Sequence, residues 1–194
     1  MEIEHNNKSG YVRCWLNENE KEQVLDHYSD DATRKLALML MLKSGLRVRE
    51  VPRVRKTDVS ESDAGFYVLT VRESKTGTRQ TILDDETKNM IDASYSFSDR
   101  SSDQPCVPKS KRTIQRWVTS AGEELAEQTG DANWEHLSCH DLRRTWATTM
   151  LSAGVSDSLT MKYGGWDNHD TLQEHYVRMS DEQVAKQLNE AGVL

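Results

Sequence analysis

The chain has 194 residues, 36% of them hydrophobic, so it can bury one sizeable core and we expect one domain. Its formal net charge of −7 argues against a uniformly basic surface, and no apolar run approaches the roughly 18 residues that a membrane helix needs. Three unevenly spaced cysteines, Cys14, Cys106 and Cys139, indicate no disulfide framework and fit a reducing cytoplasm.

Two helices are predicted near the start of the chain. Asn17 is a good N-cap for a helix over residues 18–29. Asp31 opens a second helix, which Gly45 ends in the left-handed cap position. A short helical turn is expected next, around residues 50–51.

Residues 54–83 have a different pattern, which predicts strands. The segments RVRKTDVS, FYVLTVRE and RQTILD alternate or carry β-branched runs, and KTGT between the last two is a turn signal. We therefore expect a fold that is mainly α with a small three-stranded antiparallel β-sheet, with Lys75 near a hairpin tip.

Helices resume at about residue 84. An apolar stripe with a spacing of about 3.6 residues stops at Gly130. Ser138, with Asp141 three residues later, forms a capping-box variant for a helix that runs to about residue 152. A final helix is predicted over about 180–191. Three tryptophans are assigned to the core: Trp117, Trp134 and Trp146.

The helix over 139–151 carries the most informative residues. Apolar residues recur every four positions along it and form its core face. His140 and Arg143 lie three positions apart and share another face. The planar fork of an arginine suits phosphate oxygens, and a histidine can donate a hydrogen bond or move a proton near neutral pH. Arg144 points elsewhere and is expected to be a surface charge. Taken alone, such a pair is more often a salt-bridged structural feature.

Four blocks change that balance: LALMLMLKSGLRVREV, ESKTGTRQTIL, HDLRRTWAT and YGGWDNHDTLQEHYV. In this order they resemble the tyrosine recombinase (phage integrase) family, from about residue 15 to residue 188. The resemblance implies six catalytic residues: Arg47, Lys75, His140, Arg143, Trp166 and Tyr176. It implies two supporting residues, Glu50 and His175.

The resemblance implies DNA strand cleavage and rejoining without a metal or other cofactor. Tyr176 would attack the scissile phosphate and form a 3′-phosphotyrosyl intermediate, while Arg47 and Arg143 bind the non-bridging oxygens. Lys75 would protonate the leaving 5′-oxygen, and His140 would act as hydrogen-bond donor or general base.

The remaining two roles are less direct. Trp166 would pack against the site with its indole N–H toward the phosphate, and Glu50 would orient His140 or an arginine.

The terminal block departs from the family pattern. Trp166 stands where most relatives have a histidine, and the gap to Tyr176 is one residue longer than usual. Either His169 or His175 could supply the missing imidazole.

Basic residues cluster despite the negative net charge, which predicts a basic face for double-stranded DNA on an acidic body. The candidates for DNA binding are Arg49, Arg53, Arg55, Lys56, Arg79, Lys109, Lys111 and Arg112. The acids could equally be ordinary solvated helix faces. Their abundance also suits a high-salt cytoplasm, such as that of a halophilic archaeon hosting a virus or plasmid.

Relatives clamp DNA with an additional N-terminal domain, so we interpret residues 1–14 as a linker remnant and residues 15–194 as the catalytic domain, with the core-binding domain absent. We expect weak, salt-dependent DNA affinity, a monomer in solution, and a tetramer on DNA in which the helix at about 180–191 docks on a neighbouring protomer. No membrane association is expected.

Other interpretations remain open. An inactive DNA-binding or regulatory module with the same fold is the main alternative, and a type IB topoisomerase would share the catalytic residues. A metal site at His136, Cys139 and His140 matches no standard zinc spacing. A Cys139–His140 nucleophile pair fails because adjacent helix residues point apart. The target site and the choice between integrase, resolvase and invertase are not encoded in any motif.

Overall fold

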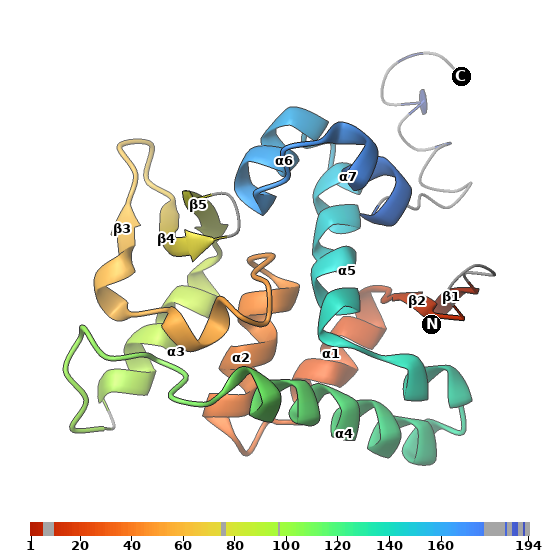
Figure 1. The fold of residues 1–194 in the computed structure, drawn as a ribbon, viewed down its shortest axis with the longest axis horizontal. Helices are drawn as coiled ribbons and strands as arrows, with labels where there is room; N and C mark the ends of the chain where they lie inside the picture. Colours follow the sequence, from red (N-terminus) through yellow and green to blue (C-terminus); the bar gives the residue numbers. More distant parts are fainter. Residues whose placement is uncertain are drawn as a thin grey trace.

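The computed structural model describes residues 1–5, 10–74, 77–96 and 98–176, together with residues 185, 188, 189 and 192. Over this part the protein is mainly α with a three-stranded antiparallel sheet, which confirms the predicted fold class. Helix α5 (Cys139–Ser152) runs through the centre, the sheet lies to one side of it, and α4 (Lys111–Thr129) lies across the base (Figure 1).

The first two helices follow their predicted caps. Helix α1 (Glu18–Asp26) begins with a capping box between Asn17 and Glu20, and the Asp31 side chain accepts two backbone N–H groups at the start of α2 (Ala32–Leu42). Both helices end about three residues earlier than predicted. Gly45 does adopt a positive φ of 65°, but in the loop after α2, where a Cβ would collide with the ring of Trp146.

Strands β3 (Val59–Glu61), β4 (Tyr67–Ser74) and β5 (Gly77–Leu83) form the sheet in that order. The first predicted strand was placed too early, because residues 51–53 and 56–58 form 3₁₀ turns. Asp58 stabilises the second turn by accepting the backbone N–H of Arg55. Lys75, at the hairpin tip, lies outside the described residues.

The later helices match the predicted pattern. Helix α4 ends at Gly130 (φ 72°), and α5 begins with the predicted capping box between Ser138 and Asp141. The predicted helix over 180–191 falls almost wholly outside the described residues. From residue 85 onward the described helices are α3 (Asp85–Ser96), α4 (Lys111–Thr129), the 3₁₀ helix Ala132–His136, α5 (Cys139–Ser152), α6 (Asp157–Gly164) and α7 (His169–Tyr176).

The core lies between α2 and α5. Every residue from Leu36 to Leu42 is buried, and so are Trp134 and Trp146. Trp117 is half-buried and packs against this core, with the Arg34 guanidinium 5.5 Å from its ring centroid, so its assignment to the core holds in part. The prediction that Arg144 is a surface charge is wrong. Arg144 is 3% exposed and pairs with the Asp141 carboxylate, which is itself buried.

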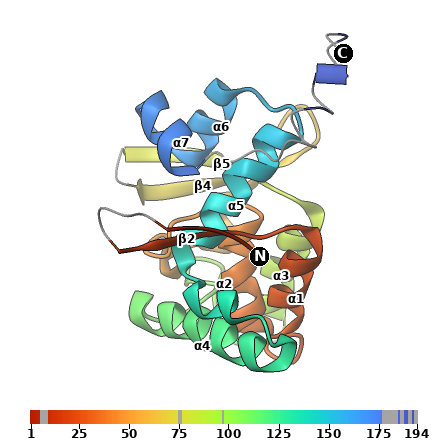
Figure 2. The same cartoon turned by 90° about the vertical axis from the view of Figure 1, so that its right-hand side faces the viewer.

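The N-terminal segment contains a hairpin that the sequence did not predict. Strands β1 (Glu2–His5) and β2 (Val12–Trp15) pair antiparallel and lie across α5 (Figure 2). The backbone N–H of Cys14 donates to Asp141 (3.1 Å), and that of Leu16 donates to Thr145 (3.1 Å). Much of the segment interpreted as a linker remnant is therefore packed against the helix that carries His140.

In the part of the chain that the structure describes, no helix combines the length and apolarity needed to cross a membrane.

Candidate active site

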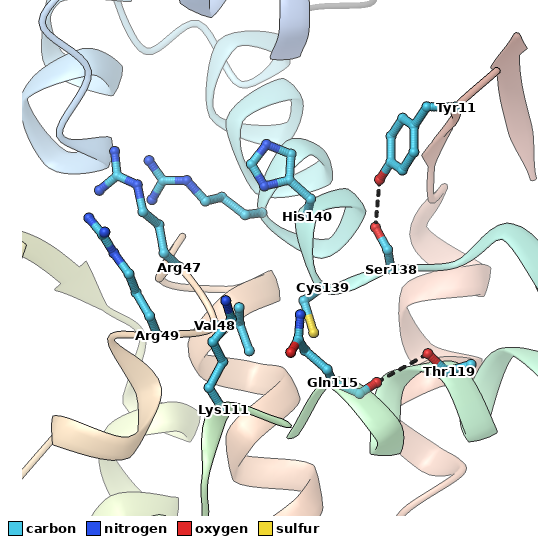
Figure 3. A pocket seen from close by; sticks show the side chains of 11 residues that line it. Tyr11, Arg47, Val48, Arg49, Lys111, Gln115, Thr119, Ser138, Cys139 and His140 are labelled. Atoms are coloured by element: carbon cyan, nitrogen blue, oxygen red, sulfur yellow. Dashed lines mark hydrogen bonds between the residues drawn. The ribbon is translucent and has the colours of Figure 1, made fainter. Parts of the chain in front are cut away.

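A cavity of about 350 Å³ opens beside the first turn of α5 (Figure 3). Among the described residues that line it, four are cationic and none carries a carboxylate. It is lined by Tyr11, Arg47, Val48, Arg49, Lys111, Gln115, Thr119, Ser138, Cys139, His140 and Arg143. Such a lining favours an anion, because the positive charges share one small volume.

His140 and Arg143 both line this cavity, as their spacing on α5 predicted. His140 is exposed, whereas Arg143 is fully buried. The Arg143 guanidinium donates to the carbonyls of Gly45 and Gly164 and lies 4.2 Å from the ring centroid of Trp166. These contacts fix its orientation from both sides.

Arg47 follows α2 and reaches the same cavity. Its Nη1 donates to Oε1 of Glu50 (3.0 Å), and its Nη2 donates to the carbonyl of Gly165 (2.7 Å). Glu50 Oε2 accepts the Arg47 backbone N–H (2.8 Å). The Glu50 carboxylate therefore contacts both the side chain and the backbone of Arg47.

Glu50 is 2% exposed and stays charged in a cationic setting. Burial acts to raise the pKa of its carboxyl, but the charges of three arginines and a backbone hydrogen bond hold that pKa below its ordinary value.

Arg79 does not lie where a DNA contact would. It is 8% exposed, and its guanidinium donates to Glu50 Oε2 (2.8 Å) and to the carbonyl of Tyr163 (2.5 Å). Burial lowers the pKa of this guanidinium, and the charge of Glu50 opposes the shift. The alternation of side chains along β5 could have indicated this burial, since Arg79 points to the same face as the buried Thr81 and Leu83.

Trp166 is 8% exposed and stacks on Trp146 with ring centroids 6.0 Å apart. Arg143 lies over its ring. His169 is at the surface, where its Nε2 lies 2.6 Å from an Asp157 carboxylate oxygen.

Three predicted residues cannot be placed by their side chains. Tyr176 is the last residue of α7, which packs against α5, but only its backbone is described. The same holds for His175, and Lys75 lies outside the described residues between Ser74 and Gly77, which pair across the hairpin.

The other basic residues predicted to bind DNA are exposed. Arg49 and Lys111 line the cavity. Lys56 is 2.8 Å from Asp92, so part of its charge is already compensated. The remaining exposed candidates for DNA binding are Arg53, Arg55, Lys109 and Arg112.

Several lining residues were missed by the sequence reasoning. Tyr11 reaches the rim from the unpredicted hairpin, with its hydroxyl 2.9 Å from that of Ser138. Gln115 and Thr119 continue one face of α4 from Lys111 at spacings of four, a pattern that the sequence did contain.

The cysteines are buried and unpaired with one another. Burial raises the pKa of each of the three thiols to about 12, so none is a thiolate near neutral pH. Within the described ranges, no three His, Cys, Asp or Glu side chains gather as metal ligands would.

The sequence profile described as "Phage integrase family" matches residues 14–183 of this chain. The chain belongs to the phage integrase family. A search of curated proteins found no match.

Solved structures share the fold of this integrase-family chain. XerA recombinase is similar with a TM-score of 0.72 and 21% identity, over 92% of this chain and 65% of that one. XerH site-specific recombinase bound to palindromic difH substrate is similar with a TM-score of 0.67 and 16% identity, over 93% of this chain and 52% of that one. The catalytic domain of bacteriophage HP1 integrase is similar with a TM-score of 0.58 and 17% identity, over 94% of this chain and 99% of that one. The chain thus spans less than two thirds of the XerA and XerH chains but nearly all of the HP1 catalytic domain. At these identities the likeness establishes the fold.

Proposed function

We propose that this integrase-family chain performs site-specific DNA recombination, by metal-independent cleavage and rejoining of DNA strands through a 3′-phosphotyrosyl intermediate. One observation carries the proposal. Arg47 and His140, nearly a hundred residues apart, line one cationic cavity with Arg143. An ordinary structural ion-pair network would place carboxylates there instead.

In the proposed reaction, the Tyr176 hydroxyl oxygen attacks the scissile phosphorus as its proton leaves. The bond to the 5′-oxygen breaks, and the 3′-phosphate stays on the tyrosine. Lys75 supplies the proton to the 5′-oxygen, which leaves as a hydroxyl. Attack by another 5′-hydroxyl reverses these steps and joins new strands, so no external energy source is needed.

The arginines stabilise negative charge on the non-bridging oxygens as the transition state forms. Arg47 is half-buried and presents its guanidinium to the cavity, while two carbonyls and Trp166 hold Arg143 at its inner wall. His140 accepts the proton of the Tyr176 hydroxyl as the new phosphorus–oxygen bond forms. Trp166 supports Arg143 from below by stacking.

DNA binding would use the exposed basic residues around the cavity, with Arg49 and Lys111 nearest the phosphate. Tyrosine recombinases clamp DNA between a catalytic domain and a further domain. We propose that residues 15–194 form the catalytic domain of such a clamp. We further propose a monomer in solution that assembles into a tetramer on DNA, and a cytoplasmic location.

An inactive DNA-binding module with the same fold is the second candidate. The burial of Arg143 favours it, since a fully buried guanidinium must gain access before it can touch a phosphate.

Covalent trapping separates the two candidates. The protein is mixed with nicked DNA that carries repeats flanking its own gene, and the products are separated on a denaturing gel beside Tyr176→Phe. We expect a slow-migrating protein–DNA band that Tyr176→Phe lacks. Binding without any covalent band in the wild type would support the inactive module instead.

A further inference from the structure

The C-terminal turn of α6 contacts three arginines through three consecutive carbonyl groups. The arginines come from three separate elements: the loop after α2, strand β5 and helix α5. Each carbonyl accepts a hydrogen bond from a different arginine: Tyr163 from Arg79 (2.5 Å), Gly164 from Arg143 (2.5 Å) and Gly165 from Arg47 (2.7 Å).

A helix C-terminus suits this task, because its last carbonyls lack partners within the helix and carry the negative end of the helix dipole. The two glycines permit the close approach. A Cβ on Gly164 would collide with the ring of Trp166, and one on Gly165 would lie 2.5 Å from Cδ of Arg79. Gly165 also has a φ of 70°, which disfavours other residues.

Arg79 differs from the other two arginines. Arg47 and Arg143 line the cavity, whereas Arg79 lies behind it and is 8% exposed. Its two terminal nitrogens contact the end of α6 on one side and Glu50 on the other. Arg79 can therefore act on a phosphate in the cavity only through its neighbours, and among them Glu50 contacts the Arg47 guanidinium directly.

We propose that Arg79 is a positioning residue, which fixes the Glu50 carboxylate against the end of α6 and so sets the direction of the Arg47 guanidinium. The inference deepens the proposed function, and its cleavage readout rests on that function.

Glu50 divides its two oxygens between its partners. Oε1 accepts from the Arg47 side chain, and Oε2 accepts from Arg79 and from the Arg47 backbone. Without Arg79, the carboxylate keeps, of its described bonds, only those from Arg47, so its position relative to the end of α6 depends on Arg47 alone. A misplacement of about 1 Å in a catalytic group costs on the order of 100-fold in rate.

The experiment compares Arg79→Ala and the milder Arg79→Gln with Arg79→Lys as the conservative rescue. Arg72→Ala is the matched control. Arg72 lies in the same hairpin and pairs with another buried carboxylate, Asp58 (2.5 Å), but its own side chain is 59% exposed and lies outside the cavity. Both alanine variants therefore remove an arginine from a buried carboxylate, and only one acts on Arg47.

The first readout needs no DNA. It is the Nε–Hε resonance of Arg47 in ¹⁵N NMR spectra, assigned by its loss in Arg47→Lys. We expect one sharp, dispersed signal in the wild type and in Arg72→Ala. The signal should broaden or shift toward free arginine in Arg79→Ala and Arg79→Gln, and partly recover in Arg79→Lys.

The second readout is single-turnover cleavage at saturating DNA, with DNA affinity measured separately. We expect cleavage by Arg79→Gln to fall about 100-fold with a DNA Kd within about threefold of wild type. Arg72→Ala should lose less than about threefold in rate.

Two results would overturn the inference: an Arg47 signal in Arg79→Gln that matches the wild type, or a broad Arg47 signal in the wild type itself. Should Arg79→Ala fail to fold, Arg79→Gln decides the outcome. If the wild type forms no covalent complex, the recombinase proposal fails, and the Arg47 resonance still decides the role of Arg79.

Discussion

Glu50 is the single side chain on which the arrangement of the cationic cavity depends most. One buried carboxylate contacts both Arg47 and Arg79, and the charge of Arg143 acts on it as well. Removing a partner from a buried pair leaves an uncompensated charge, which typically costs about 3–5 kcal/mol. Glu50 therefore serves both stability and the geometry of the site.

We predict that Glu50→Gln lowers the free energy of unfolding by about 3 kcal/mol at pH 7, measured by urea denaturation. Because the pKa of Glu50 is held below its ordinary value in the folded state, its ionised form stabilises the protein above that ordinary value. That stability is lost as the pH falls through the lowered pKa.

The loss from Glu50→Gln should accordingly be largest near neutral pH and shrink under acidic conditions. A loss that is the same at every pH down to about 3 would mean that the ionisation of Glu50 contributes nothing.

The catalytic residues assigned by resemblance differ in how much the sequence alone could say about them. The spacing of His140 and Arg143 placed both at one cavity. Nothing local indicated that Arg144 would be buried, because its partner Asp141 was assigned to the capping box alone. Asp141 both caps α5 and pairs with Arg144. Burial raises the pKa of its carboxyl despite the nearby charge of Arg144.

The end of α6 is the element that joins the sheet to the helices at the site. Its carbonyls contact arginines from β5, from α5 and from the loop after α2. Figure 1 shows α6 above the sheet and beside α5, in the position that this role requires.

We predict that Gly165→Ala slows DNA cleavage far more than Gly154→Ala does. Both glycines have positive φ angles, 70° and 82°, so both substitutions cost about 1–2 kcal/mol through the backbone. A Cβ at Gly165 would press on Cδ of Arg79, whereas one at Gly154 would meet none of the described atoms within 4 Å.

Thermal denaturation and single-turnover cleavage would separate the two effects. We expect the two variants to lose similar amounts of Tm. Only Gly165→Ala should also cleave DNA about tenfold more slowly, or slower still. Equal cleavage by the two variants would show that the close contact with Arg79 does not matter.

Secondary elements with strong local signals were predictable, and those fixed by distant contacts were not. The caps at Asn17, Asp31 and Ser138 set helix starts within one residue. The hairpin of β1 and β2 was missed because its four-residue strands carry little pattern, and β2 is fixed by bonds to Asp141 and Thr145 on α5. The alternation in β5 could have indicated that Arg79 is buried, but its partners Glu50 and Tyr163 are distant in sequence and no local pattern reveals them.

The whole molecule combines an acidic body with a cationic cavity, so its affinity for DNA should depend on a limited set of charges. Each phosphate contact that is neutralised releases counterions, and the affinity then falls as salt rises. Binding that rests on these few phosphate contacts should be weak and should weaken further as the salt concentration rises.

We predict that Lys111→Gln weakens DNA binding and reduces the slope of log K against log salt by about 1. Lys111 lines the cavity, whereas Lys35 pairs with Asp26 and lies outside it. Lys35→Gln is therefore the matched control, and its slope should equal that of the wild type. Fluorescence anisotropy across a salt titration measures both, and identical slopes for the two variants would exclude Lys111 from the DNA contact.

We also predict that light scattering finds a monomer for the free protein and a tetramer on DNA carrying a full recombination site. A stable tetramer without DNA would contradict this assembly order.

The most direct test of the account is to locate the covalent bond. The protein is trapped on nicked DNA, digested with protease and nuclease, and the nucleotide-bearing peptide is sequenced by mass spectrometry. We expect a nucleotide joined through its 3′-phosphate to Tyr176. An adduct on another residue, or one formed through a 5′-phosphate, would contradict it.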